Sequence, residues 1–119
     1  MRVAIVGSRD YPDPGVAVRN YIEAARDGGE FYGGTIIISG GARGIDTAAV
    51  EYADYLGLPT IVYPADWGRQ GKAAGYARNE DIIADCDRVV AFWDGESKGT
   101  RHTIELALKN RKRLEVVFP

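Results

Sequence analysis

Short apolar runs alternate along this chain with stretches in which apolar residues recur at helical spacing. Most of the runs are continuous, which is typical of strands buried on both faces of a parallel sheet. The segments predicted to be strands are residues 3–6, 35–39, 60–63, 88–93 and 114–118. A helical pattern lies between each pair of consecutive strands.

The clearest helical pattern covers residues 45–56, where apolar side chains recur at i, i+3, i+4, i+7, i+8 and i+11. This helix is predicted to stop at Gly57, just before Pro59. Weaker stripes cover residues 18–25, 74–82 and 104–108.

Strict alternation of strand and helix predicts right-handed crossovers and an α/β fold. We expect a Rossmann-like three-layer sandwich with a five-stranded parallel sheet in the order 3-2-1-4-5. No linker, repeat or low-complexity tract divides the chain, so residues 1–119 are expected to form a single nucleotide-binding domain. Ligands of such sheets bind at the carboxyl ends of the strands, near the point where strand order reverses.

Composition narrows the function classes. The chain has a formal net charge of −2, and no apolar run approaches the roughly 20 residues that span a bilayer. It begins in a predicted strand without the pattern of a signal peptide, so we expect a cytoplasmic protein. One cysteine and one histidine cannot form a zinc or iron–sulfur site, and we expect neither a metal nor a cofactor.

All four loops that follow the first four predicted strands combine glycine with arginine or lysine. These loops are residues 7–11, 39–46, 64–79 and 93–103. Glycine lets the backbone approach an anion, and arginine presents a fork that matches phosphate oxygens. The fold would gather these cations into a cationic rim, which indicates a nucleotide-like ligand. The rim residues are Arg9, Arg43, Arg69, Lys72, Lys98 and Arg101.

Several of these residues have a second interpretation. The glycines of residues 40–44 also suit a tight turn between strand and helix. Asp46 is either a partner of the helix dipole or a ligand contact. Thr100 is either a helix N-cap or a ligand contact.

The loop sequences GSRDY, SGGARGID, GKAAGYARN and DGESKGTRHTIELA resemble the YspA-like branch of the SLOG superfamily, which includes DprA/Smf and the LOG phosphoribohydrolases. The resemblance spans nearly the whole chain. It implies a nucleotide-derived ligand with phosphate on residues 40–44 and 99–100, and with Arg78 reaching in from the third helix. It also allows a homodimer, since relatives of this superfamily often pair.

The LOG pattern carries a glutamate three residues after its loop threonine, and this chain has Thr103 there. Glu105 lies two residues later, which turns its side chain by about 200° on a helix. A threonine hydroxyl cannot stabilise an oxocarbenium-like state as a carboxylate does. Catalytic residues therefore stay unassigned.

The leading functional hypothesis is binding of a nucleotide or nucleotide-derived ligand, in a sensor or sequestering role. One alternative is hydrolysis of an N-glycoside or phosphate in a nucleoside monophosphate or ADP-ribose-like ligand. The other is DprA-like binding of single-stranded DNA, which the acidic composition and few aromatic residues argue against. The predicted ligand-binding residues are Gly7, Ser8, Arg9, Ser39, Gly40, Gly41, Arg43, Gly44, Asp46, Lys72, Arg78, Asn79, Gly99, Thr100 and Thr103.

Overall fold

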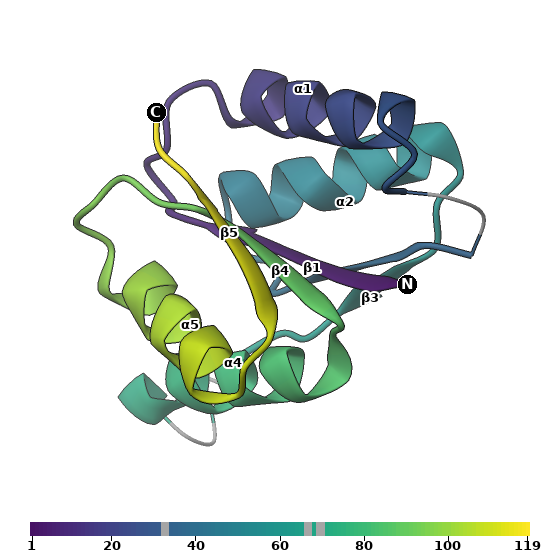
Figure 1. The fold of residues 1–119 in the computed structure, drawn as a ribbon. Coiled ribbons are helices and arrows are strands. Elements are labelled where there is room, and N and C mark those ends of the chain that lie inside the picture. The colour runs from purple at the N-terminus through teal and green to yellow at the C-terminus, as the bar shows by residue number, and fades with distance from the viewer. Residues whose placement is uncertain (32–33, 66–67, 69–70) are drawn as a thin grey trace.

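The computed structural model describes residues 1–31, 34–65, 68 and 71–119, and within them the strands form one parallel sheet (Figure 1). The sheet order is β3-β2-β1-β4-β5, which confirms the predicted order and the predicted Rossmann-like fold. The strands are β1 (Arg2–Gly7), β2 (Ile36–Ser39), β3 (Thr60–Val62), β4 (Arg88–Phe92) and β5 (Arg113–Val117). Their ends agree with the predicted ones to within one residue.

The helices lie in two layers, with α1 and α2 on one face of the sheet and α4 and α5 on the other (Figure 1). They are α1 (Pro14–Asp27), α2 (Ile45–Leu56), α4 (Ala74–Asp85) and α5 (Lys98–Lys109), and a 3-10 turn η1 (Gly71–Ala73) precedes α4. None of these described helices is long and apolar enough to cross a membrane. The cytoplasmic location stays a prediction.

The central strands supply the core on both faces. Successive side chains of a strand point to opposite faces. In β1, Val3 and Ile5 therefore pack toward α1 and α2, while Ala4 and Val6 pack toward α4 and α5. Burial of each branched side chain stabilises the fold by about 1.5–3 kcal/mol. This double-sided burial explains why β1 and β4 are continuous apolar runs in the sequence.

The two edge strands, β3 and β5, are less buried than the apolar runs of the sequence predicted. All five residues of β4 are buried, whereas the residues of β3 and β5 are exposed or only partly buried. The reason is their position, because each of these two strands has a neighbour on one side only.

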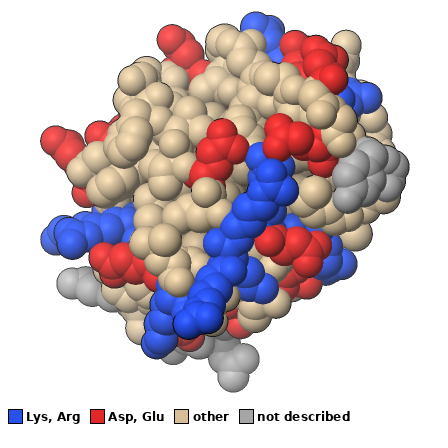
Figure 2. All heavy atoms as spheres, in the orientation of Figure 1, with Lys and Arg blue, Asp and Glu red and all other residues tan. Residues whose placement is uncertain are grey.

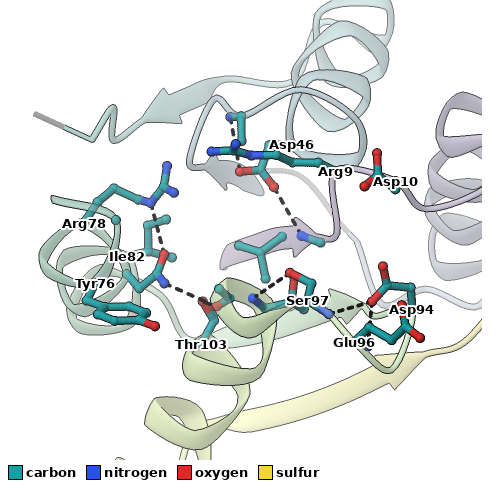
Figure 3. A pocket seen from close by; sticks show the side chains of 17 residues that line it. Arg9, Asp10, Asp46, Tyr76, Arg78, Ile82, Asp94, Glu96, Ser97 and Thr103 are labelled. Atoms are coloured by element: carbon teal, nitrogen blue, oxygen red, sulfur yellow. Dashed lines mark hydrogen bonds between the residues drawn. The ribbon is translucent and has the colours of Figure 1, made fainter. Parts of the chain in front are cut away.

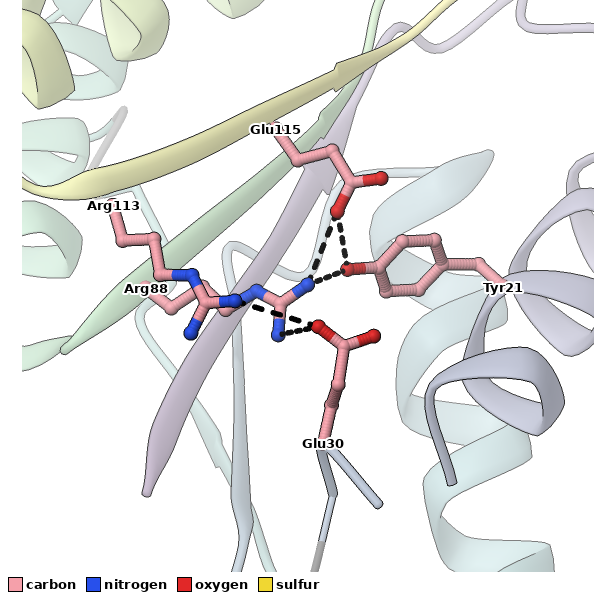
Figure 4. A network of polar contacts seen from close by, with 5 residues as sticks. All are labelled: Tyr21, Glu30, Arg88, Arg113 and Glu115. Atoms are coloured by element: carbon pink, nitrogen blue, oxygen red, sulfur yellow. Dashed lines mark hydrogen bonds and ion pairs between the residues drawn. The ribbon is translucent and has the colours of Figure 1, made fainter. Parts of the chain in front are cut away.

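Arg88, the first residue of β4, is a buried arginine to which the sequence assigned no role (Figure 4). The Arg88 side chain is only 4% exposed, and its guanidinium contacts Glu30 and Glu115 at 3.1 Å each. Arg88 also donates to the Tyr21 hydroxyl, which in turn donates to Glu115. Burial, with the hydrogen bond to Glu115, raises the pKa of Tyr21. Arg113 approaches the same Glu30 from the surface at 3.5 Å. We call these five residues the Arg88 network.

Candidate functional site

A pocket of about 500 Å³ lies at the carboxyl ends of β1 and β4, where strand order reverses (Figure 3). We call it the switch-point pocket. It lies between the first turn of α2, the side of α4 and the first turn of α5. The predicted site residues that line it are Gly7, Arg9, Asp46, Arg78, Asn79, Gly99, Thr100 and Thr103.

Asp46 holds the loop that precedes α2. Its carboxylate accepts hydrogen bonds from the backbone amides of Gly7 at 3.2 Å and Ala42 at 3.3 Å. Ser39 donates from its hydroxyl to the Asp46 carbonyl oxygen at 2.9 Å, and the same hydroxyl accepts from the Gly41 amide. Asp46 therefore joins the end of β1 to the glycine loop, a role that neither sequence interpretation included.

Burial raises the pKa of the Asp46 carboxyl to about 6, although Arg78 and the two amides pull it down. A carboxyl with a raised pKa holds its proton more tightly in the folded state than in the unfolded state. The stability that this proton provides is present at low pH and is lost as the pH rises through about 6.

We expect the free energy of unfolding to fall by about 2–3 kcal/mol between roughly pH 4 and pH 6 because Asp46 ionises. Urea denaturation across this window measures the slope, and Asp46→Asn should remove it. Asp85 and Asp94 have lowered pKa values, so their opposite contributions fall at more acidic pH. A slope that is unchanged in Asp46→Asn would contradict the assignment.

Gly40 lets two charged groups approach the loop. A Cβ atom at Gly40 would lie 2.5 Å from Nη1 of Arg78 and 2.7 Å from Oδ2 of Asp46. Arg78 donates from Nη1 to the Gly40 carbonyl oxygen at 2.6 Å. Gly41 differs, because its Cβ would meet Cγ1 of Val62 on β3 at 2.9 Å. Gly41 thus serves the turn and does not line the pocket.

Arg78 and Asn79 connect α4 to both sides of the pocket. Arg78 donates from Nε to the Asn79 side-chain oxygen at 3.0 Å, in addition to its bond to Gly40. The Asn79 amide lies 3.4 Å from the Gly99 carbonyl oxygen and 3.2 Å from Nδ1 of His102 on α5. A guanidinium has five donors, so Arg78 keeps donors for a ligand.

The first turn of α5 is capped by Ser97, so the interpretation of Thr100 as the N-cap is wrong. The Ser97 hydroxyl accepts from the Thr100 amide at 3.4 Å. Thr100 lies inside the helix and is buried, and its hydroxyl is 3.5 Å from that of Ser8. The Ser8 hydroxyl accepts from the Asp94 amide at 3.2 Å, so Ser8 supports the pocket from beneath. Thr103 donates to the Gly99 carbonyl oxygen at 3.3 Å.

The predicted cationic rim does not form as expected. Arg43 is exposed and pairs with Asp10 at 3.2 Å, and Arg101 pairs with Glu105 at 3.0 Å. Neither of them lines the pocket, nor does Lys98. Arg69 and the side chain of Lys72 lie outside the described residues. Among the described residues, the basic side chains that line the pocket are Arg9 and Arg78.

Sequence reasoning missed Tyr76, Ser97 and Glu96, which also line the pocket. Tyr76 lies two residues before Arg78 in the stretch that carried the resemblance, so its position was a usable signal. Gly44 is part of the site in a different way, because a Cβ there would lie 2.7 Å from the Arg9 carbonyl oxygen. It permits close contact between the loops that follow β1 and β2.

This chain matches a protein-family model and is similar in sequence to a phage protein. A sequence model described as YAcAr, the YspA, cpYpsA-related SLOG family, matches residues 1–70. The Gene 61 protein of Mycobacterium phage D29 is 37% identical over an alignment of 82 residues, and the match covers 64% of this chain and 66% of that protein.

Two solved structures share the fold. The X-ray structure of DNA processing protein A (DprA) from Streptococcus pneumoniae has a TM-score of 0.78 and 24% identity, covering 97% of this chain and 49% of that one. The DprA of Helicobacter pylori, described for its single-stranded DNA binding mode, has a TM-score of 0.73 and 26% identity, covering 98% and 64%. The chain thus spans about half to two thirds of the length of these relatives.

These neighbours correct one expectation. Net charge and composition argued against a nucleic-acid partner. However, the Helicobacter pylori protein, which is described as binding single-stranded DNA, shares its fold with 98% of this chain. The argument was wrong because net charge averages over the whole molecule, whereas binding depends on the charges that remain free at one site. Figure 2 shows basic and acidic side chains interspersed on one face of the molecule.

Proposed function

We propose that this chain, which belongs to the YspA, cpYpsA-related SLOG family, binds single-stranded DNA through the switch-point pocket. The observation that carries the proposal is the convergence of Arg9 and Arg78 on a pocket in which three of the four described acidic side chains are engaged by other groups. The likeness to the Helicobacter pylori protein supports single-stranded DNA as the partner.

Three of the four described acidic residues that line the pocket, all except Glu96, are held by another group. Asp10 pairs with Arg43, and Asp46 accepts from two backbone amides. Asp94 accepts from the amides of Glu96 and Ser97 at 2.8 Å each, and these amides lower its pKa. Much of the negative charge at the pocket is thereby offset locally.

Two features favour a phosphate group near the glycine loop. Arg9 forms no ion pair with any described residue, and Arg78 uses two of its donors on Gly40 and Asn79. The N-terminus of α5 also adjoins the pocket, and the helix dipole there favours an anion. A phosphodiester between the two arginines would receive charge-assisted hydrogen bonds.

Loss of Arg78 should weaken DNA binding. We expect Arg78→Ala to reduce affinity roughly ten- to a hundredfold, since a hydrogen bond to a charged group contributes about 1.5–3 kcal/mol. Fluorescence anisotropy with a labelled oligothymidylate of about 20 nucleotides, at several salt concentrations, measures the change.

Arg101→Ala is the matched control, because Arg101 is exposed on α5, pairs with Glu105 and does not line the pocket. It should leave affinity within about twofold, as expected for an exposed ion pair. Equal losses in the two variants would indicate that general charge attracts the DNA. Absence of binding by the parent chain would reject the proposal.

A free nucleotide is the second candidate, because a pocket of about 500 Å³ lies within the range of small-molecule sites. Calorimetry with mononucleotides separates the two candidates. If a mononucleotide binds tightly and the oligonucleotide does not, the second candidate replaces the first.

A further inference from the structure

We propose that the ring of Tyr76, backed by the imidazole of His102, stacks on a nucleobase at one end of the switch-point pocket. This inference rests on the proposed function and specifies which part of the nucleic acid each end of the pocket contacts.

Tyr76 is on α4, lines the pocket and is 48% exposed. Its ring centroid lies 4.4 Å from that of His102, with the two rings tilted by 48°. His102 comes from α5, and its Nδ1 is 3.2 Å from the Asn79 amide nitrogen. One side of the tyrosine is therefore supported by a neighbouring ring, while about half of the residue stays open to solvent.

Two other tyrosines, Tyr11 and Tyr21, use their rings for core packing. Tyr11 and Tyr21 meet Phe92 edge to face within the core on the α1 and α2 side of the sheet. Tyr76 instead remains half-exposed where it borders a polar pocket. An aromatic ring held in this way is a platform on which a base can stack, and stacking is tolerant of sequence because every base has a π-face.

The pocket has a charged end and an aromatic end. Figure 3 shows Arg9 and Asp46 across the top of the pocket and Tyr76 near Thr103 at the lower left, with Arg78 between these levels. Ile82 also lines the pocket and adds an apolar wall on the α4 side. A nucleotide unit can place its phosphate toward the arginines and its base toward Tyr76. Such a base must be unstacked, which favours a single strand over a duplex.

The test compares two labelled oligonucleotides of about 20 nucleotides, an oligothymidylate and an abasic oligonucleotide with the same phosphates but no bases. Tyr76→Ala should weaken binding of the oligothymidylate about tenfold and leave the abasic oligonucleotide unchanged. Tyr76→Phe keeps the ring and should bind like the parent. Tyr55→Ala is the matched control, because Tyr55 on α2 is 80% exposed and does not line the pocket.

His102 acts through Tyr76 and is a positioning residue. His102→Ala should lower the parent's preference for the oligothymidylate over the abasic oligonucleotide, without weakening binding of the abasic one. A purely structural role would instead weaken both oligonucleotides by the same factor.

The outcomes separate this inference from the proposed function. If the parent binds neither oligonucleotide, the proposed function is wrong and the stacking role of Tyr76 is rejected as well. If the parent binds both equally well, DNA binding stands and the platform is rejected. If Tyr76→Ala weakens both oligonucleotides equally, or neither, the ring does not contact a base and the inference is likewise rejected.

Discussion

Gly44→Ala is expected to lower the free energy of unfolding by about 3–5 kcal/mol, because both the backbone conformation and the space at this position exclude a side chain. Gly44 has φ +84° and ψ −125°, outside the left-handed region that other residues occasionally adopt. Its Cβ would also lie 2.7 Å from the carbonyl oxygen of Arg9, a backbone atom that cannot move aside alone. Urea denaturation followed by circular dichroism measures the loss.

Gly57→Ala is the matched control at the other end of the same helix. Gly57 has φ +76° in the left-handed region, and its Cβ would meet no atom within 4 Å. Only the conformational cost remains, which is about 1 kcal/mol. Equal losses at the two glycines would show that contact with Arg9 does not restrict Gly44.

Arg88→Ala is expected to destabilise the fold by about 3–4 kcal/mol, since it removes a side chain that is both buried in packing contacts and ion-paired through its guanidinium. Its guanidinium lies 5.9 Å from the Tyr21 ring centroid and 5.7 Å from that of Phe31, so its loss also leaves a gap between rings. Glu30 and Glu115 are partly exposed, so water partly compensates for their lost partner. Thermal and urea unfolding give the magnitude.

Arg113→Ala tests the same network from its surface. Arg113 is 66% exposed and reaches Glu30 at 3.5 Å. We therefore expect Arg113→Ala to lower the free energy of unfolding by at most about 0.5 kcal/mol. Arg88→Met should fall between the two, because it refills the space but not the charge. A large loss in Arg113→Ala would show that the network depends on its exposed member.

Strand order and pocket position could be predicted because they follow from local patterns. The apolar runs that became β1 and β4 are continuous in the sequence, and the parallel sheet they imply places its site where strand order reverses. The family resemblance was borne out by the match to residues 1–70. It also singled out Arg78, which lines the pocket and which spacing alone did not indicate.

The pairing of charged side chains could not be predicted, because it depends on distances between segments that are remote in sequence. Asp10 and Arg43 lie in different loops, and only the folded chain brings them to 3.2 Å. The prediction of the N-cap of α5 was wrong for a different reason. Both Ser97 and Thr100 are good capping residues, and only the backbone geometry selects Ser97. Whole-chain charge was likewise a poor guide to a partner.

The family match ends at residue 70, yet the pocket draws on both halves of the chain. The first half supplies the glycine loop and Asp46, and the second half supplies Arg78, Tyr76 and Thr103 from α4 and α5. Substitutions on α4 and α5 can therefore change the lining of the pocket without altering the matched half of the chain. Among proteins that share the first half, we expect ligand preference to follow the residues of the second half.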